Sequence, residues 1–170
     1  MRMKIRKGGA EDIPAILALL DAAASRLVAE GRTDQWGTEP LSARPGVVCN
    51  LHAYVAEGTP WLAEIDGEPA GTLILTSGPG ANSAIAPAAE PENYVHWLAA
   101  DPRHTGRRVG AALLAHAAAE TRRAGLGLLR VDCYAGGDGK LVAYYESQGF
   151  ARTETYENDG WRGQVLERRL

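Results

Sequence analysis

The stretch DPRHTGRRVGAALL, residues 101–114, combines two glycines and three arginines with the start of an apolar, alanine-rich run. Glycine lets the main chain approach a ligand closely. Unpaired N–H groups and the helix dipole attract anions to the first turn of a helix. Arg103, Arg107 and Arg108 add charged donors that suit phosphate oxygens. The pattern therefore predicts a phosphate-binding turn at the start of a helix.

Two common phosphate-binding motifs do not fit this turn. The residues from Gly106 to Gly110 lack the Gly-Lys-Ser/Thr ending of a Walker loop. They also fail the Gly-x-Gly-x-x-Gly pattern of dinucleotide-binding proteins. A phosphate-containing ligand of another class is therefore expected.

The longer stretch LAADPRHTGRRVGAALL, residues 98–114, resembles motif A of the GNAT acetyltransferase superfamily. In that motif a strand ends in Asp-Pro, and the turn Gln/Arg-x-x-Gly-x-Gly/Ala precedes a Leu-Leu helix. A literal alignment matches Arg107, Gly110 and Ala112. Spacing from the Asp-Pro and Leu-Leu pairs matches Thr105, Arg108 and Gly110 instead, and we prefer it because strand, turn and helix stay in register. It puts Arg108 where the family has glycine, at a cost of about 1 kcal/mol if the backbone there is left-handed.

Two further stretches resemble the same family. LVAYYESQGF, residues 141–150, is similar to motif B, and residues 4–20 resemble the family's first strand and helix. The resemblance covers almost the whole chain and implies one GNAT domain over residues 1–170. The implied fold is α/β (α+β), with a mixed central sheet of about six to seven strands flanked by about four helices. Asp138 stands where small bacterial members have an asparagine.

The resemblance implies that acetyl-coenzyme A is the co-substrate and that the turn binds its pyrophosphate. A main-chain N–H at the end of the preceding strand is implied to hold the developing oxyanion. The implied coenzyme contacts are Leu98, Ala99, Ala100, Thr105, Gly106, Arg107, Arg108, Val109, Gly110, Ala111, Asp138 and Tyr145.

Acetyl transfer to an amine needs a base, an oxyanion donor and a proton for the leaving thiolate. No enzyme nucleophile is needed when both substrates bind together. The resemblance implies that Tyr145 is the acid, although it also fits a core position on an amphipathic helix. Tyr144 is expected to be structural.

His96 is the candidate base, because an imidazole titrates near neutrality. It could act directly or through water, and a purely structural histidine fits equally well. Tyr94 shares its strand face, since side chains alternate along a strand. Glu64 and Asp132 are weaker alternatives for the base, and Asp132 could instead pair with Arg130.

The acceptor is expected to be the primary amine of a small molecule, which attacks acetyl-coenzyme A directly. Gln35, Trp36 and Tyr94 are the predicted acceptor-binding residues. Trp97, Tyr156 and Trp161 are further candidates, and each aromatic also fits ordinary packing. Asp34 or Glu39 would suit a cationic amine. The alternatives are acetylation of a protein N-terminus, a lysine or an aminoacyl-tRNA, or an acyl-coenzyme A-binding module without activity.

Hydrophobic periodicity and turn residues predict the elements that position these groups. Asp12 is expected to cap the first helix, and residues 31–46 to form a loop. The strand from Tyr94 and the strand at Leu128 should be parallel, because a helix connects them. Segment 77–93 is too long for a simple connection, so it is functional or mobile. The expected order is strand 3–6, helices 13–30 and 47–56, a hairpin around Asp66-Gly67, strand 94–100, helix 110–123, strand 128–135, helix 140–148 and two final strands.

Composition narrows the function. A chain of 170 residues forms one domain with a sizeable core, and its net charge of −3 argues against a general nucleic-acid surface. Cys49 and Cys133 are expected to be buried free thiols. No secretory signal and no apolar run of about 20 residues is found, so we expect a cytoplasmic protein with no membrane contact. No metal site is expected, and a homodimer is a candidate assembly.

Overall fold

The computed structural model describes residues 2–170 and contains a mixed seven-stranded sheet of order β1-β2-β3-β4-β5-β7-β6. The strands are β1 (Met3–Lys7), β2 (Thr59–Ile65), β3 (Glu68–Thr76), β4 (Asn93–Ala100), β5 (Leu128–Tyr134), β6 (Ala151–Asn158) and β7 (Trp161–Arg169). The helices are α1 (Ile13–Ala29), α2 (Thr33–Trp36), α3 (Pro45–Glu57), α4 (Val109–Arg123) and α5 (Lys140–Ser147). The α/β class and the predicted strand number are confirmed.

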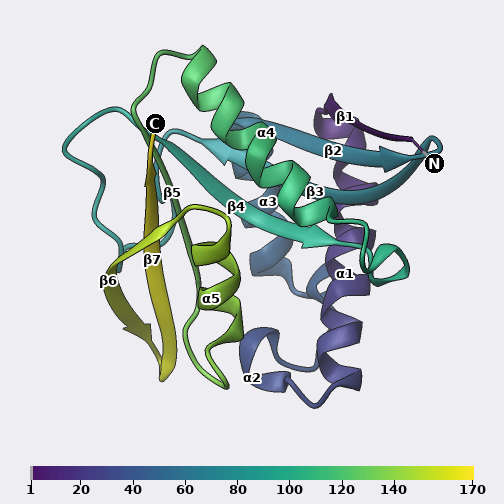
Figure 1. Ribbon diagram of the computed structural model, residues 1–170. Coiled ribbons are helices and arrows are strands. Elements are labelled where there is room, and N and C mark those ends of the chain that lie inside the picture. The colour runs from purple at the N-terminus through teal and green to yellow at the C-terminus, as the bar shows by residue number, and fades with distance from the viewer. Residues whose placement is uncertain (1) are drawn as a thin grey trace.

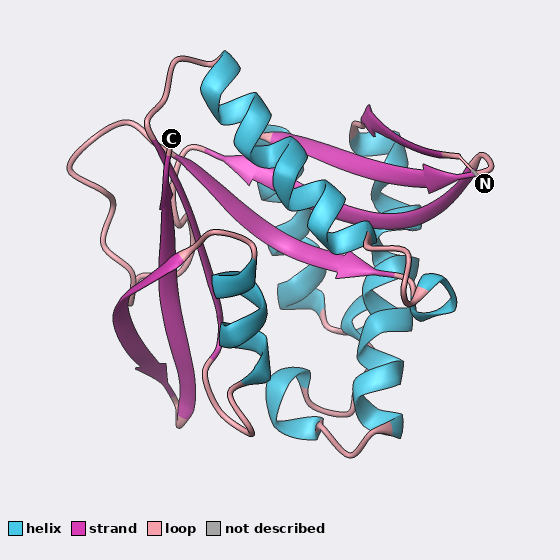
Figure 2. Ribbon diagram, in the orientation of Figure 1, coloured by secondary structure: helices cyan, strands magenta, loops and turns pink. Residues whose placement is uncertain are grey.

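Helices cover both faces of the sheet, with α4 and α5 in front and α1 and α3 behind in the view of Figure 1, and Figure 2 shows the same layers by element type. Strand β3 is buried on both sides, as its continuous apolar run requires. Leu73 and Leu75 pack in the cluster with α4, whereas Ile74 packs in the cluster with α1 and α3. Two cores therefore share one sheet.

The βαβ unit forms as expected. Strands β4 and β5 run parallel, and they are the neighbours that α4 connects. They pair only at Asn93–Val95 with Leu129–Val131, although both strands continue further. A β-bulge interrupts β4 beyond this point, where Trp97 adopts φ 52°. The two strands therefore separate toward their carboxyl ends.

Two-residue turns connect the hairpins. Asp66 and Gly67 have φ values of 52° and 83°, and Asp159 and Gly160 have 48° and 83°. Positive φ at both central residues matches the right-handed twist of a hairpin. The hairpin predicted at Asp66-Gly67 is confirmed.

Three local predictions are wrong in whole or in part. Residues 33–36 form α2 rather than a loop, so the described chain has five helices instead of about four. Asp12 occupies the N-cap position of α1 as predicted, but its side chain makes no capping hydrogen bond, because its carboxylate accepts from Arg6 (2.8 Å) and the Gly9 N–H (3.0 Å) instead. Cys49 is exposed on α3, and only Cys133 is buried. No helix within residues 2–170 is long and apolar enough to span a membrane.

Candidate active site

A cleft of about 780 Å³ opens where β4 and β5 separate. Side chains on both faces of these strands line it, together with α5 on one side and α2 and α3 on the other. Splayed strands leave main-chain groups unpaired, and this geometry lets a ligand lie against the strand edge. The lining residues from the strands and α5 are Val95, His96, Trp97, Leu98, Val131, Asp132, Cys133, Tyr134, Leu141 and Tyr145.

The turn before α4 has the features of an anion site. Gly106 and Arg108 have φ values of 89° and 58°, so the usual glycine position of the preferred alignment does adopt a left-handed backbone. The first intrahelical bond runs from Ala112 N–H to Arg108 O (3.0 Å), and no side chain of residues 2–170 caps the helix. The N–H groups of residues 109–111 therefore precede the intrahelical bonds and can bind a ligand.

Gly110 lies against a tyrosine on α5. A Cβ atom at position 110 would lie 2.7 Å from the Tyr144 hydroxyl oxygen, closer than van der Waals contact allows. The Tyr144 ring is half-buried, and burial raises the pKa of its hydroxyl. Tyr144 therefore stands beside the first turn of α4 rather than deep in the core.

Tyr145 lies in the wall of the cleft. Its ring is 6 % exposed and packs edge-on against Tyr144 and Phe150, with centroids 5.6 and 6.0 Å away. Burial raises the pKa of the Tyr145 hydroxyl well above its ordinary value. The phenol therefore keeps its proton at neutral pH, as a proton donor must.

His96 is held between two tyrosine rings in the cleft. Its imidazole stacks on Tyr54 at 3.9 Å and on Tyr94 at 4.9 Å. Its Nε2 lies 3.0 Å from Gly78 O and 2.9 Å from Thr76 Oγ1. A carbonyl oxygen only accepts hydrogen bonds, so Nε2 carries the proton and Nδ1 keeps the lone pair. Burial lowers the pKa of His96, so the ring is neutral at pH 7 and can accept a proton.

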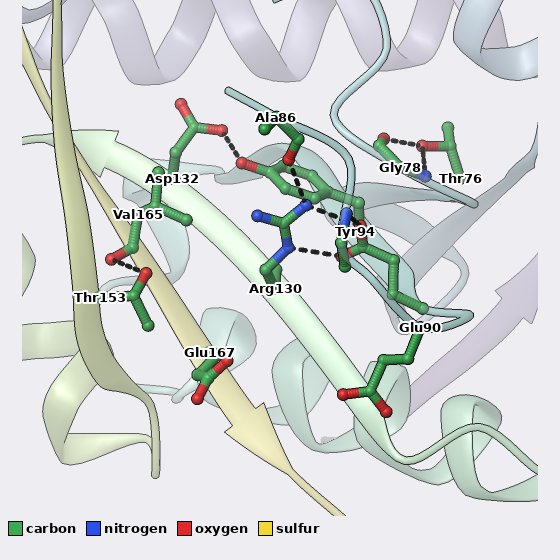
Figure 3. A network of polar contacts seen from close by, with 12 residues as sticks. Thr76, Gly78, Ala86, Glu90, Tyr94, Arg130, Asp132, Thr153, Val165 and Glu167 are labelled. Carbon is green, nitrogen blue, oxygen red and sulfur yellow. Dashed lines mark hydrogen bonds and ion pairs between the residues drawn. The ribbon is translucent and has the colours of Figure 1, made fainter. Parts of the chain in front are cut away.

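Asp132 is a carboxylate in the wall of the cleft. It accepts hydrogen bonds from the hydroxyls of Tyr94 (2.7 Å) and Tyr156 (2.5 Å), and Figure 3 shows the contact with Tyr94. Burial and the nearby carboxylate raise the pKa of both hydroxyls. Tyr94 is fully buried and does not line the cleft, so the prediction that it contacts the acceptor is not supported, and its own contacts with cleft residues are those with Asp132 and His96.

Arg130 does not pair with Asp132. Its guanidinium donates to both carboxylate oxygens of Glu92 at 2.7 Å and to Ala86 O at 3.0 Å, and it lies 5.4 Å from the centre of the Tyr94 ring (Figure 3). This buried ion pair ties segment 77–92 to β5. The segment in turn contributes Pro79 and Asn82 to the cleft wall.

The predicted acceptor residues Gln35 and Trp36 line the cleft. Trp36 contacts Trp97 with ring centroids 6.1 Å apart. The indole N–H of Trp161 donates to Gln35 O at 2.8 Å, so α2 is joined to the β6–β7 hairpin. The residues from α2, α3, the connecting segments and the β6–β7 hairpin that complete the lining are Thr33, Asp34, Gln35, Trp36, Gly37, Leu41, Arg44, Val47, Asn50, Tyr54, Pro79, Asn82, Tyr156, Asn158 and Trp161.

Some predicted residues lie outside the cleft. Asp138 is exposed, where it pairs with Arg32 (2.7 Å) and accepts from the Lys140 N–H (3.1 Å). Glu64 pairs with Arg6 (3.0 Å) at the opposite end of the sheet, so it is not placed to be a base.

Other predicted coenzyme residues occupy different surroundings. Leu98 lines the cleft, whereas Ala99 is buried toward α1 and Ala100 packs toward α4. Thr105, Gly106, Arg107 and Arg108 are exposed, Val109 is buried, and Gly110 and Ala111 are half-buried.

Sequence reasoning missed the partners of His96. Tyr54, Thr76 and Gly78 come from α3, the end of β3 and the following loop, and no spacing pattern connects them. The length of segment 77–93 was the one available signal. Within residues 2–170, no group of three or more acidic, histidine or cysteine side chains is arranged to hold a metal ion.

Comparisons with known proteins agree with this geometry. A family model described as the acetyltransferase (GNAT) family matches residues 21–150. No curated protein sequence matches the chain. Among solved structures, a GNAT-family acetyltransferase from Listeria monocytogenes superposes with a TM-score of 0.75 at 20% identity, covering 99% of this chain and 95% of the other.

Two further solved structures share the fold. The ribosomal-protein-S18-alanine N-acetyltransferase of Escherichia coli gives a TM-score of 0.69 at 17% identity, over 99% of this chain and 94% of the other. The IAA acetyltransferase of Bacillus cereus ATCC 14579 gives a TM-score of 0.66 at 18% identity, over 99% of this chain and 100% of the other. These superpositions establish a common fold, and the family model covers most of the chain. The chain therefore belongs to the GNAT acetyltransferase family and is an acyl-coenzyme A N-acetyltransferase.

Proposed function

We propose that this protein transfers the acetyl group of acetyl-coenzyme A to the primary amine of a small molecule, by direct attack with both substrates bound. The observation that carries the proposal is a single cleft lined by a protonated phenol, Tyr145, and a neutral imidazole, His96. The uncapped first turn of α4 supplies a separate anion-binding feature.

The residues present fit the coenzyme. Open N–H groups at residues 109–111 suit a diphosphate, and the Arg108 side chain is exposed beside them. A Cβ at Gly106 would meet no atom within 4 Å, so the chain leaves space above the turn. The unpaired edge of β4 beyond Val95 provides main-chain groups along which an extended pantetheine could lie.

The chemistry can be assigned to the two cleft residues. The amine nitrogen gives up a proton to His96 and attacks the acetyl carbonyl carbon, which forms the carbon–nitrogen bond. The carbon–sulfur bond then breaks, and the sulfur takes the electron pair and a proton from Tyr145. The proton held by His96 returns to Tyr145 through solvent, so transfer to a neutral amine neither gains nor loses a proton. An acceptor that binds as an ammonium ion first loses one further proton to solvent, which frees the nitrogen lone pair for attack. A cysteine nucleophile is disfavoured, because burial raises the pKa of Cys133 to about 12.

The walls of the cleft favour a compact acceptor. The Trp161–Gln35 hydrogen bond joins the β6–β7 hairpin to α2, and Asn158 donates to Asn82 at 3.4 Å. Tyr54 links α3 to the loop by donating to Pro79 O. These contacts surround the acceptor end, and the cleft volume falls within the range of about 300–1,000 Å³ typical of small-molecule sites. A polypeptide acceptor would have to separate them. A cytoplasmic location and a homodimer stay predictions from the sequence.

Calorimetric titration with acetyl-coenzyme A, followed by a thiol-release screen over amines, amino acids and antibiotics, tests the proposal. We expect saturable binding below millimolar concentration and turnover with at least one free amine, independent of salt. Absence of binding would refute the enzymatic assignment for this site. Steeply salt-dependent binding of tRNA, with no turnover of free amines, would favour a macromolecular acceptor instead.

A further inference from the structure

We infer that the acceptor is an arylalkylamine, meaning a single ammonium group on an aromatic body without a carboxylate, and that Asp132 is the residue that selects it. This inference rests on the proposed function and assigns the chemistry of the acceptor end of the same cleft. Three features of that end support it: one carboxylate held in place, aromatic walls around it, and a single lining cation that is anchored to main-chain oxygens.

Asp132 is a positioned carboxylate rather than a solvated one. Its two oxygens each accept one tyrosine hydroxyl, from Tyr94 on β4 and from Tyr156 on β6. A carboxylate oxygen has two lone pairs, so each oxygen keeps one for a ligand. The tyrosine contacts fix the side-chain rotamer before the ligand arrives, which lowers the entropy lost on binding. An ammonium group is the ligand that matches this charge and these acceptors.

The surrounding walls are aromatic on two sides. Trp36 and Trp97 are in contact on the side of α2 and β4. Trp161 contacts Tyr134 and Tyr156, with ring centroids 5.4 and 6.1 Å apart, on the side of β5 and the β6–β7 hairpin. Aromatic faces attract both a flat ring and a nearby cation. A ligand with an aryl group two or three bonds from its nitrogen could use both walls and the carboxylate together.

The charges of the lining exclude other amine classes. Among the described residues that line the cleft, Arg44 is the one lysine or arginine. Its Nη2 donates to the main-chain oxygens of Trp36 and Glu39, which anchors the guanidinium to the main chain next to α2, and Arg44 forms no ion pair with Asp132. An amino acid would bring a second charge, a carboxylate, for which the lining offers this one anchored cation, and a carboxylate that does not reach it is costly away from water. Asp132 and Asp34 are the two acidic side chains of the lining, too few for a polycation such as an aminoglycoside.

The experiment compares three acceptors that differ in defined features. The specificity constant kcat/KM is measured by thiol release with 2-phenylethylamine, with phenylalanine, which adds a carboxylate, and with putrescine, which lacks the ring and carries a second ammonium group. We expect kcat/KM for 2-phenylethylamine to exceed the value for each of the other two acceptors by about tenfold or more. A charged group left unpaired in the cleft typically weakens binding by at least this factor. Equal or higher values for phenylalanine or putrescine would overturn the inference, while the acetyltransferase assignment would stand.

A matched pair of variants tests the role of Asp132. Asp132→Asn keeps the shape but removes the charge, and we expect kcat/KM for 2-phenylethylamine to fall about 10- to 100-fold. Glu157→Gln removes one charge from β6, at the exposed residue that follows Tyr156 and lies outside the cleft lining, and should change this value less than twofold. The acetyl-coenzyme A Kd, measured on each variant, reports whether the coenzyme site is intact. An unchanged kcat/KM in Asp132→Asn would overturn the assignment of Asp132. Failure of the wild-type protein to bind acetyl-coenzyme A would instead refute the proposed function itself.

Discussion

Arg108 combines two opposing contributions that substitution can separate. Its backbone is left-handed, with φ 58° and ψ 37° at the N-cap of α4. Its exposed side chain lies beside the open N–H groups of that helix. Arg108→Gly relieves the backbone and removes the guanidinium, whereas Arg108→Ala removes the guanidinium alone. We therefore expect the two variants to agree in coenzyme binding and to differ in stability.

The expected size follows from the backbone geometry. A residue with a Cβ atom pays roughly 1–2 kcal/mol in the left-handed region, and glycine loses about 0.5–1 kcal/mol more backbone entropy on folding. Arg108→Gly should thus be more stable than Arg108→Ala by about 0.5–1 kcal/mol. For a chain of this length that difference raises Tm by about 1–4 °C. Loss of a charged donor at an exposed diphosphate site should weaken acetyl-coenzyme A binding about five- to tenfold in both variants.

Urea denaturation of the ligand-free protein measures the stability difference, and calorimetry measures the Kd. Acetyl-pantetheine, which lacks the diphosphate, serves as the control ligand, and its affinity should be the same in both variants and the wild type. Arg108→Gly no more stable than Arg108→Ala would refute the left-handed assignment. An unchanged Kd for acetyl-coenzyme A in both variants would refute the role of the guanidinium.

Three further predictions follow, two from residues of the cleft and one from the buried Arg130–Glu92 ion pair. Tyr145→Phe should lower kcat by about 100-fold or more, the usual contribution of a general acid, while calorimetry gives an unchanged Kd for acetyl-coenzyme A. The acid limb of the kcat–pH profile at saturating amine should fall below pH 6.5, because burial lowers the pKa of His96 and only its neutral form accepts a proton; a limb above 6.5 would contradict this. Glu92→Gln leaves a buried arginine without its counter-charge and should destabilise the protein by about 3–5 kcal/mol in urea denaturation.

Local signals predicted the elements correctly where neighbouring residues decide the conformation. The Asp66-Gly67 turn has the two positive φ values that its dipeptide favours. Gly31, with φ 74°, follows the end of α1 as a left-handed C-terminal glycine should. The parallel pairing of β4 and β5 followed from the handedness and length of one crossover. Each of these depends on a short stretch of chain.

The composition of the site depended on contacts that a short stretch cannot specify. Alternation placed Tyr94 and His96 on one face of β4, and their rings are indeed stacked. Alternation does not predict how deeply a side chain is buried, however: Tyr94 is fully buried, whereas His96 lines the cleft. The two hydroxyls on Asp132 come from residues 38 and 24 positions away. Only the packed sheet brings them together.

Unfavourable backbone conformation occurs at two places in the proposed site, the cleft wall and the start of α4. Of the four non-glycine residues with positive φ within residues 2–170, Asp66 and Asp159 lie in hairpin turns that require it. The other two are Trp97, which lines the cleft, and Arg108, which is the N-cap of α4. The bulge turns the Trp97 side chain toward α1 and α3, on the face of the sheet that also holds Tyr54. Leu98 then points to the opposite face, toward α4. Conformations of this kind cost of order 1–3 kcal/mol each and persist only where the surrounding structure holds them. Here they separate β4 from β5 and leave the N–H groups of α4 open, so the unfavourable backbone is concentrated at the two positions that shape the site.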